Sequence, residues 1–369
     1  MLKWNTYYAL IGWATGMIGD PGWKDAERSF LSEETLRHNE ACIGNQYRTI
    51  LAGLEKRTGK KLKFEIVNNY DFYTWVSYLD FLREVGKYHT VNQMMAKDTV
   101  KKRIEDPTKS ISYTEFSYML LQGYDFYYLN KHNWLTLQVW GQDQWGNLVT
   151  WVELIRKKAE TDTYVFTWPL LVDSAGKKFW KSEGNALFLD KNKTSPYKIY
   201  QYFINTLDTD VERFLKILTL LETSEIQDII IVHNKNLELR LGQKRLAFEV
   251  VKTIHSEEDA ILCEKISDFL FSDADKITLF KWLSESEVQS FYTEVWWLEY
   301  SGQNLFELFV QSSLEASNST ARQTLQNGWM FINEVNITDG KYDFSCDWID
   351  GKYLLLRKGK KSYKIIIKK

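Results

Sequence analysis

Two short segments place cationic side chains where they can bind an anion. Lys24 and Arg28 lie four residues apart, on one face of a predicted helix start, and such a pair can clamp a phosphate. The segment KKFWKSEGN supplies Lys178, Lys181 and Ser182. Flexible lysines can stabilise the charge of a phosphoryl transition state. A solvated first turn and an exposed lysine-rich loop are the plainer alternatives for the two segments.

Polar residues also follow one side of a predicted helix. In SYMLLQGYDF, Tyr118, Gln122 and Asp125 occupy positions i, i+4 and i+7. Apolar residues surround this helix, so some of the polar side chains should face inward. A buried polar group needs a partner, and a ligand can be that partner. The alternative is a polar stripe on the surface.

A third group of polar residues follows a predicted strand, in the segment WGQDQWGN. Gly141 permits close approach of a ligand, while Asp143 and Gln144 can bond a ribose or an ammonium group. An ordinary strand-to-helix turn uses the same residue types. Taken alone, this segment therefore leaves both interpretations open.

The C-terminal end is basic although the chain has a net charge of only −2. From residue 357 onward it contains no acid. This asymmetry predicts a patch that faces RNA, with a solubilising charged end as the alternative. The basic residues are Arg357, Lys358, Lys360, Lys361, Lys364, Lys368 and Lys369.

These residues must be positioned by the elements that the apolar pattern predicts. Short apolar runs predict strands at 7–12, 61–69, 135–141 and 163–172. Amphipathic segments predict helices at 24–59, 80–104, 112–132 and 151–160. Gly59 is a plausible helix stop, and Ser112 with Glu115 fits a capping box. The alternation of strands and helices predicts an open α/β sheet with a ligand at the carboxyl ends of its strands.

The second half of the chain has a different pattern. Residues 195–286 are mostly helical and predict an all-α domain. After residue 301, short helices at 304–314 and 319–328 precede a strand at 330–339. The last segment, 352–369, predicts a hairpin that turns at Lys358-Gly359-Lys360.

Composition excludes several classes of protein. Cys42, Cys263 and Cys346 form no CxxC pair, which suits a reducing cytosol. The five histidines form no HxxH or HExxH spacing, so we expect no protein-bound metal. No apolar run reaches the ~18 residues of a membrane helix, and we expect no membrane partner.

Taken together and in order, these segments resemble the bacterial tyrosyl-tRNA synthetases, which are class I aminoacyl-tRNA synthetases. The segments that carry the resemblance are ATGMIGDPGWKDAER, VNNYDF, SYTEFSYMLLQGYDF, GQDQWGN, KKFWKS and TSPYKIYQYFIN. STARQTLQNGWMFINEVNITD with LLLRKGKKSY is similar to the family's S4-like RNA-binding end. The similarity runs from Lys3 to Lys369.

The resemblance implies a role for each candidate residue. The tyrosine ammonium would contact Asp20, Tyr118 and Gln122, and its phenol would contact Asp125 and Asn69. The ATP ribose and the adenylate would contact Gly141, Asp143 and Gln144. The leaving pyrophosphate would contact Lys178, Lys181 and Ser182, which match the KMSKS-type signature, together with Lys24 and Arg28. RNA would contact Arg322, Arg357, Lys358, Lys360 and Lys361.

The sequence departs from the family pattern in two ways. No HIGH-type signature (HxGH) occurs, and we expect an N-terminally truncated chain that lacks the first sheet strand. Tryptophan also stands where the family has glycine, and the chain has 15 tryptophans but only 19 glycines. We hypothesise that UGA encodes glycine in the source and is written here as tryptophan. The matched positions are Trp13, Trp23, Trp140, Trp180 and Trp329, with Trp4, Trp134, Trp151, Trp296 and Trp297 as further cases.

The resemblance therefore implies a cytoplasmic tyrosine–tRNA ligase. It would use ATP with its Mg²⁺ to form tyrosyl-adenylate and pyrophosphate, and would then transfer the tyrosyl group to tRNA(Tyr). We expect a Rossmann-like parallel-sheet domain at 1–195, a helical domain at 196–300 and an S4-like α+β domain at 301–369. A homodimer would use the segment near 69–115. The alternatives are a catalytically inactive paralogue that binds RNA and a tryptophan-specific synthetase.

Overall fold

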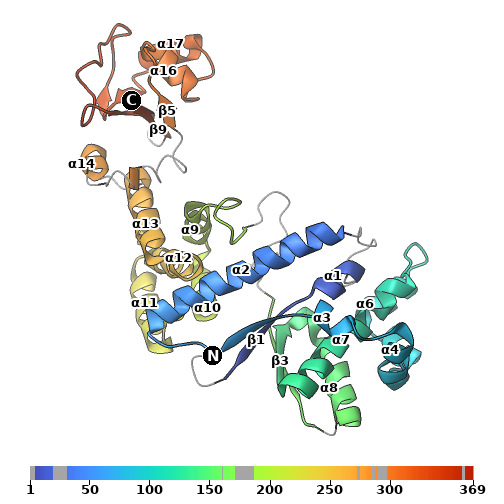
Figure 1. Ribbon diagram of the computed structural model, residues 1–369. Coiled ribbons are helices and arrows are strands. Elements are labelled where there is room, and N and C mark those ends of the chain that lie inside the picture. The colour runs from blue at the N-terminus through green and yellow to red at the C-terminus, as the bar shows by residue number, and fades with distance from the viewer. Residues whose placement is uncertain are drawn as a thin grey trace. The chain divides into compact units, whose positions relative to one another are not determined.

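The computed structural model describes most of the chain. Its described residues are 5–19, 31–159, 161–170, 187–271, 275–281, 283, 287–288, 297–359 and 362–368. The chain divides into two compact units, residues 1–186 and 187–369 (Figure 1). None of the helices in the described ranges is both long and apolar enough to span a bilayer.

The first unit alternates strands and helices, as the sequence predicts. Its elements are β1 (Tyr7–Ile11), α1 (Trp13–Ile18), α2 (Glu33–Thr58), β2 (Phe64–Asn68), α3 (Tyr70–Tyr73), α4 (Tyr78–Glu84), the 3₁₀ helix η1 (Gly86–Tyr88), α5 (Val91–Met95), α6 (Asp98–Ile104), α7 (Tyr113–Asn133), β3 (Leu137–Gly141), the 3₁₀ helix η2 (Gln142–Gln144), α8 (Trp145–Ala159) and β4 (Tyr164–Trp168).

The strands of this unit pair in parallel. β1 pairs with β2, and β3 pairs with β4. Among the described residues these are two separate two-stranded sheets rather than the single open sheet that we expected. The parallel direction was predicted correctly because a helix lies between the two strands of each pair, α2 in the first and α8 in the second, and returns the chain to the same end.

Two of the predicted helices have different boundaries. The helix predicted at 24–59 begins at Glu33, because the Ser32 side chain accepts a hydrogen bond from the Thr35 backbone and caps it. It ends at Gly59 as predicted, with a left-handed φ of 63°. The single helix predicted at 80–104 is wrong: the chain forms α4, η1, α5 and α6 instead. A second capping box at Thr90 starts α5 and interrupts the run.

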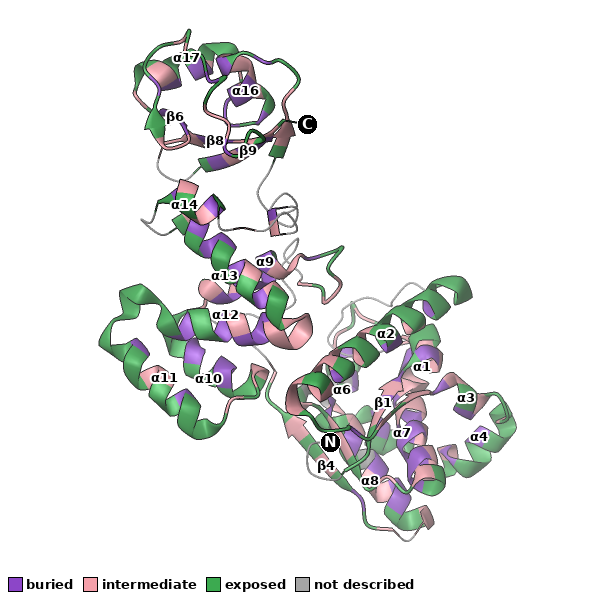
Figure 2. Cartoon of the chain, turned by 60° about the vertical axis from the view of Figure 1, so that its left-hand side comes forward, coloured by how far each residue is buried: buried purple, intermediate pink, exposed green. Residues whose placement is uncertain are grey.

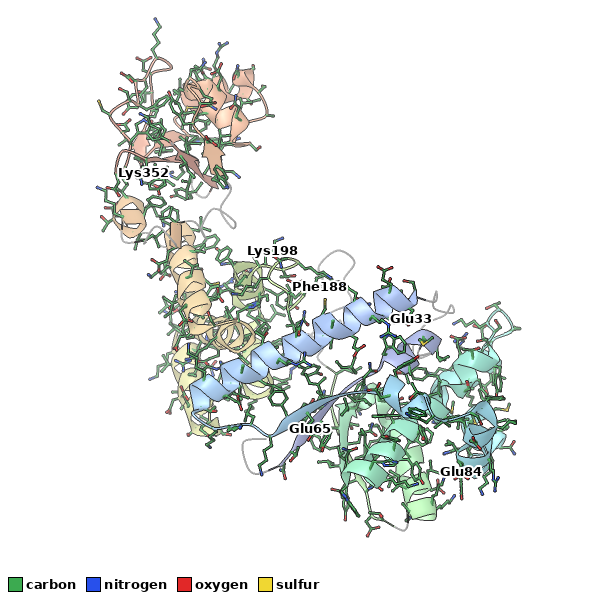
Figure 3. The ribbon with its side chains drawn as sticks, viewed as in Figure 1. Glu33, Glu65, Glu84, Phe188, Lys198 and Lys352 are labelled. Atoms are coloured by element: carbon green, nitrogen blue, oxygen red, sulfur yellow. The ribbon has the colours of Figure 1, made fainter. Side chains whose placement is uncertain are left out.

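The core of the first unit lies between α7 and α8, where Figure 2 shows buried positions on both helices. The largest contributors are Phe126 on α7 and Trp151 and Ile155 on α8, each with 2% or less of its surface exposed. Burying a side chain such as Phe126 or Ile155 contributes about 1.5–3 kcal/mol. At the edge of this core, Lys158 of α8 bonds the carboxylate of Glu84 at 2.6 Å; Glu84 is labelled in Figure 3.

Three tryptophans occupy positions that suit an indole poorly. Trp134 ends α7 with φ 58° and ψ 29°, the left-handed region that favours glycine. The ring of Trp151 lies so close to α7 that a Cβ at Gly123 would be 1.4 Å from its Cδ2 atom. The indole N–H groups of Trp13 and Trp151 are buried without an acceptor in the described part of the chain.

The second unit combines a helical part with a small sheet. Its helical elements are α9 (Pro196–Ile204), α10 (Asp208–Leu218), α11 (Thr223–Lys235), η3 (Leu237–Leu239), α12 (Leu241–Ile254), α13 (Glu257–Phe271), α14 (Lys276–Lys281), α16 (Leu305–Gln311) and α17 (Asn318–Gln326). The strands are β5 (Trp297–Glu299), β6 (Met330–Ile332), β7 (Val335–Asn336), β8 (Tyr353–Lys358) and β9 (Ser362–Ile367).

The sheet has the order β5-β9-β8-β6-β7. The predicted hairpin is confirmed, since β8 and β9 pair antiparallel from Tyr353–Ile367 to Lys358–Ser362. Helices α16 and α17 share a core with this sheet through Leu308, Phe309 and Ala321, which are all fully buried. The C-terminal segment therefore forms an α+β arrangement.

Candidate active site

Helix α7 carries the predicted polar stripe, and its start is firmly fixed. Ser112 and Glu115 form the predicted capping box. Glu115 also makes a bidentate ion pair with Arg103 of α6, at 2.9 and 3.0 Å, and both side chains are more than nine-tenths buried. One to three turns further along, Asp125 is 2% exposed, whereas Tyr118 and Gln122 are half-buried. Asp125 therefore faces inward, whereas Tyr118 and Gln122 lie between the interior and the surface.

Asn69 joins the end of β2 to Asp125. Its Oδ1 atom accepts the backbone N–H of Ala14 at 2.8 Å. Its amide nitrogen must then point the other way, and it donates to Asp125 Oδ2 at 3.0 Å and to Thr15 Oγ1 at 3.1 Å. The predicted neighbourhood of Asn69 and Asp125 is confirmed.

The second oxygen of Asp125 faces a phenol of the chain itself. The hydroxyl of Tyr73 lies 3.1 Å from Asp125 Oδ1 and 2.7 Å from the carbonyl oxygen of Leu121. Burial raises the pKa of Asp125 to about 7, although the hydrogen bonds from Asn69 and Tyr73 oppose that rise. Burial and the nearby Asp125 carboxylate raise the pKa of the Tyr73 phenol well above its usual value, so this phenol remains a donor.

A second hydrogen-bonded group connects Gln122 to the segment after β3. The Asn147 amide nitrogen donates to Gln122 Oε1 at 2.8 Å and to Gln144 Oε1 at 3.1 Å. Gln144 belongs to η2 and is 8% exposed. On the other side, the ammonium of Lys97 donates to Asn147 Oδ1 at 3.3 Å. The structure thus brings the predicted residues Gln122 and Gln144 together.

Several predicted residues lie outside this description. Gly141 ends β3 with an extended backbone, and the side chain of Asp143 is not described. The remaining predicted substrate and phosphate residues fall outside the described residues: Asp20, Lys24, Arg28, Lys178, Lys181 and Ser182. Among the described residues, no group of three or more His, Cys, Asp or Glu side chains could hold a metal ion.

The predicted RNA-facing residues differ in their surroundings. Arg322 is exposed. Arg357 pairs with Glu334 at 2.9 Å and stacks over the ring of Phe331, 3.5 Å from its centroid. Lys358 pairs with Glu315 at 2.9 Å. Two of the charges that the sequence presents as a basic patch thus have acidic partners elsewhere in the fold, while Lys360 and Lys361 lie outside the described residues.

Sequence reasoning missed Tyr73, Thr15, Asn147 and Lys97. Asn147 lies in the segment WGQDQWGN and could have been noted there as an amide one helical turn after Gln144. The other three contact the site only through the fold, and no local pattern marks them.

Two family models match most of the chain. Residues 4–272 match the model of the class I tRNA synthetases for tryptophan and tyrosine, "tRNA synthetases class I (W and Y)". Residues 284–366 match the "Tyrosine--tRNA ligase SYY-like C-terminal domain". The fold and the site therefore define a class I tRNA synthetase.

Individual relatives narrow this class. The chain is 46% identical to a tyrosine–tRNA ligase of Streptococcus pyogenes serotype M49 over 363 residues, which is 97% of this chain and 84% of that protein. It is also similar to the solved mitochondrial tyrosyl-tRNA synthetase of Aspergillus nidulans, with a TM-score of 0.65 and 30% identity over 72% of this chain and 77% of the other. The solved mitochondrial tyrosyl-tRNA synthetase of Coccidioides posadasii is similar with a TM-score of 0.61 and 29% identity, over 70% of this chain and 74% of the other. The chain belongs to the tyrosine–tRNA ligases.

Proposed function

We propose that this tyrosine–tRNA ligase recognises the phenol of L-tyrosine through Asp125 and Asn69. The proposal is supported by the buried carboxylate of Asp125, whose two oxygen atoms face the amide of Asn69 and the hydroxyl of Tyr73. The Asn69 amide donates a hydrogen bond to Asp125 Oδ2, and the Tyr73 hydroxyl faces Asp125 Oδ1. A carboxylate has about four lone-pair sites, so the hydroxyl of a bound tyrosine can share Oδ1 with Tyr73. Phenylalanine has no hydroxyl and would leave a buried acceptor without that donor, which is costly.

Other residues bind the ammonium group of tyrosine and the nucleotide. Gln122 and Tyr118, together with Asp20, hold the ammonium group. Gln144, Gly141 and Asp143 hold the ribose and the adenylate. The hydrogen bonds from Asn147 to both Gln122 and Gln144 support a single continuous site for the two substrates.

The reaction needs positioning and charge stabilisation rather than a protein nucleophile. The tyrosine carboxylate attacks the α-phosphorus of ATP, which arrives with its own Mg²⁺, and the bond to pyrophosphate breaks. Pyrophosphate leaves with its charge stabilised by lysine, arginine and hydroxyl groups. We assign that role to Lys178, Lys181, Ser182, Lys24 and Arg28. A ribose hydroxyl at the end of tRNA(Tyr) then attacks the tyrosyl carbonyl carbon of the adenylate, so that the ester bond to the tRNA forms, the hydroxyl proton is lost and AMP leaves.

The C-terminal part is the proposed RNA-binding region. We infer an S4-like domain at 301–369 that follows a helical domain at 196–300 and a Rossmann-like domain at 1–195. Its match to the C-terminal model of tyrosine ligases supports this role. Arg322, which is exposed, is the strongest described candidate for a contact with RNA phosphates, followed by Arg357 and Lys358. Lys360 and Lys361 continue the same basic turn.

We also propose a cytoplasmic homodimer that buries the surface of α4 and its neighbours. This surface exposes large apolar side chains, and such patches commonly mark interfaces. Leu79 and Tyr78 project from α4, and the Tyr78 hydroxyl bonds that of Tyr113 at 2.8 Å. The exposed large apolar residues between 69 and 115 are Trp75, Tyr78, Leu79, Leu82, Val91, Met95, Ile104 and Tyr113.

Tyrosine-dependent exchange between ATP and pyrophosphate tests the proposed site. The protein translated from its gene in its own source, with glycine at the recoded positions, should support exchange with tyrosine and not with phenylalanine, and Asp125→Ala in that protein should abolish the difference between the two. Asn69→Ala should raise the KM for tyrosine without changing that for ATP. If that protein binds RNA but supports no exchange, it is instead an inactive paralogue.

A further inference from the structure

The group around Asn147 has a direction that can be read without ambiguity. The oxygen and nitrogen of an Asn or Gln amide usually cannot be told apart by shape, and their assignment depends on their partners. Here one partner is Lys97, whose ammonium can only donate. Asn147 must therefore turn its oxygen toward Lys97 and its nitrogen toward the two glutamines.

This orientation fixes both glutamines in turn. The two amide hydrogens of Asn147 are used on Gln122 Oε1 and Gln144 Oε1, at 2.8 and 3.1 Å. Each glutamine oxygen thus has a defined direction. Gln122 comes from α7 and Gln144 from η2, so one ammonium orients side chains on two separate elements.

Lys97 is a cation that is partly withdrawn from solvent. It is half-buried, and that burial lowers the pKa of its ammonium to about 8, so the charged form still predominates at neutral pH. It lines a pocket with His89 and Glu153. Burial and the charge of Lys97 lower the pKa of His89 to about 4, so His89 is neutral there. A half-buried ammonium bonded to a neutral amide gives little stability by itself.

We propose that Lys97 is a positioning residue that orients Gln122 and Gln144 through Asn147. This inference depends on the proposed roles of those two glutamines in binding tyrosine and adenylate. Without the ammonium, the Asn147 amide can turn over together with the two glutamine amides, so that its oxygen accepts hydrogen bonds from their nitrogen atoms. Both glutamines then lose their fixed direction, and the affinities for tyrosine and for ATP fall together although Lys97 contacts neither.

The test measures exchange kinetics and tyrosine binding for Lys97→Met and Lys97→Arg in the full chain. Loss of a charged hydrogen bond predicts about a tenfold or larger rise in the KM for both tyrosine and ATP in Lys97→Met. Lys97→Arg keeps a cationic donor and should recover most of the loss. The matched control is Lys101→Met, on the exposed face of α6, which should keep both KM values.

A second variant keeps the test decisive if Lys97→Met does not fold. Asn147→Asp preserves shape and the contact with Lys97, but it replaces a donor by an acceptor. It should raise both KM values, and unchanged KM values in this single variant would overturn the proposal. Where Lys97→Met folds, adding it to Asn147→Asp should cost little more, because both changes break the same connection. Additive effects would overturn the proposal.

The remaining outcomes separate the two levels of inference. If the parent chain neither binds tyrosine nor supports exchange, the proposed site fails and takes this inference with it. If the parent is active and Lys97→Met only lowers the melting temperature, the proposed site stands and the positioning role is refuted. A rise in the KM for one substrate alone would also refute it.

Discussion

Replacing Trp134 with glycine should stabilise the first unit. Trp134 ends α7 in the left-handed region, with φ 58°. Its backbone N–H donates to the carbonyl oxygen of Asn130 at 3.1 Å, and that of Leu135 donates to Leu129 at 3.4 Å. This is the pattern of a helix that ends at a left-handed residue, a position that glycine fills most readily. The indole is 86% exposed, so the substitution removes little buried surface.

The expected gain is the difference of two backbone effects. The left-handed region costs a residue with a Cβ about 1–2 kcal/mol. Glycine loses more conformational freedom on folding, which gives back about 0.5–1 kcal/mol. The net stabilisation for Trp134→Gly is then about 0.5–1 kcal/mol. In a domain of this size that corresponds to a rise of about 1–4 °C in the melting temperature.

Urea unfolding followed by circular dichroism measures this change directly. The midpoint should rise in Trp134→Gly with no change in the dependence on urea. Trp134→Ala removes the same indole but keeps the Cβ, so it should show no gain. Trp168→Gly, at a half-exposed position in β4, should be destabilising. The reasoning fails if Trp134→Gly is no more stable than Trp134→Ala.

The remaining predictions concern the core, the site, the surface and the source. Gly123→Ala should destabilise by at least about 1–3 kcal/mol because its Cβ meets the Trp151 ring, and Trp151→Gly in the same chain should remove that penalty. Burial raises the pKa of Asp125 to about 7 in the folded chain. The stability that its protonated carboxyl contributes to the fold is therefore fully present below pH 4 and is lost as the pH rises through 7. Relative to Asp125→Asn, the parent should lose roughly 4 kcal/mol of unfolding free energy between pH 4 and pH 8, as urea titrations would show. Leu79→Asp should convert a dimer to a monomer in light scattering, whereas an unchanged mass would place the interface elsewhere. Peptide mass spectra of the protein from its source should show glycine at position 180, and an intact tryptophan there would end the recoding hypothesis.

Local signals predicted those parts of the fold that neighbouring residues determine. The capping box of Ser112 and Glu115, the helix stop at Gly59 and the β8–β9 hairpin each depend on residues a few positions apart, and all three are confirmed. The run from 80 to 104 was predicted as one helix because its apolar periodicity continues across Gly86 and Thr90. A periodic pattern does not register a new capping box inside it.

The site was predictable only where side chains share one helix or one recognisable segment. Gln122 and Asp125 could be assigned to one face of α7 from their spacing alone. Tyr73 and Lys97 reach the site across 52 and 50 positions of sequence, through contacts that no local pattern contains. The same limit explains Arg357, which looks like part of a free basic end until the fold brings Glu334 beside it.

The buried ion pair of Arg103 and Glu115 fixes the rotation of α7 about its own axis. The position of an insertion or deletion near this pair therefore decides its effect. Adding one residue to a helix rotates everything beyond it by about 100° and advances it by about 1.5 Å. The ion pair and the capping box hold Glu115 in place, so the rotation of each later residue of α7 is measured from there. A residue inserted between 105 and 111 would be absorbed by the loop and leave Asp125 in place. The same residue inserted just after Glu115 would leave a helix of unchanged composition whose face with Gln122 and Asp125 is turned away from Asn69 and Asn147.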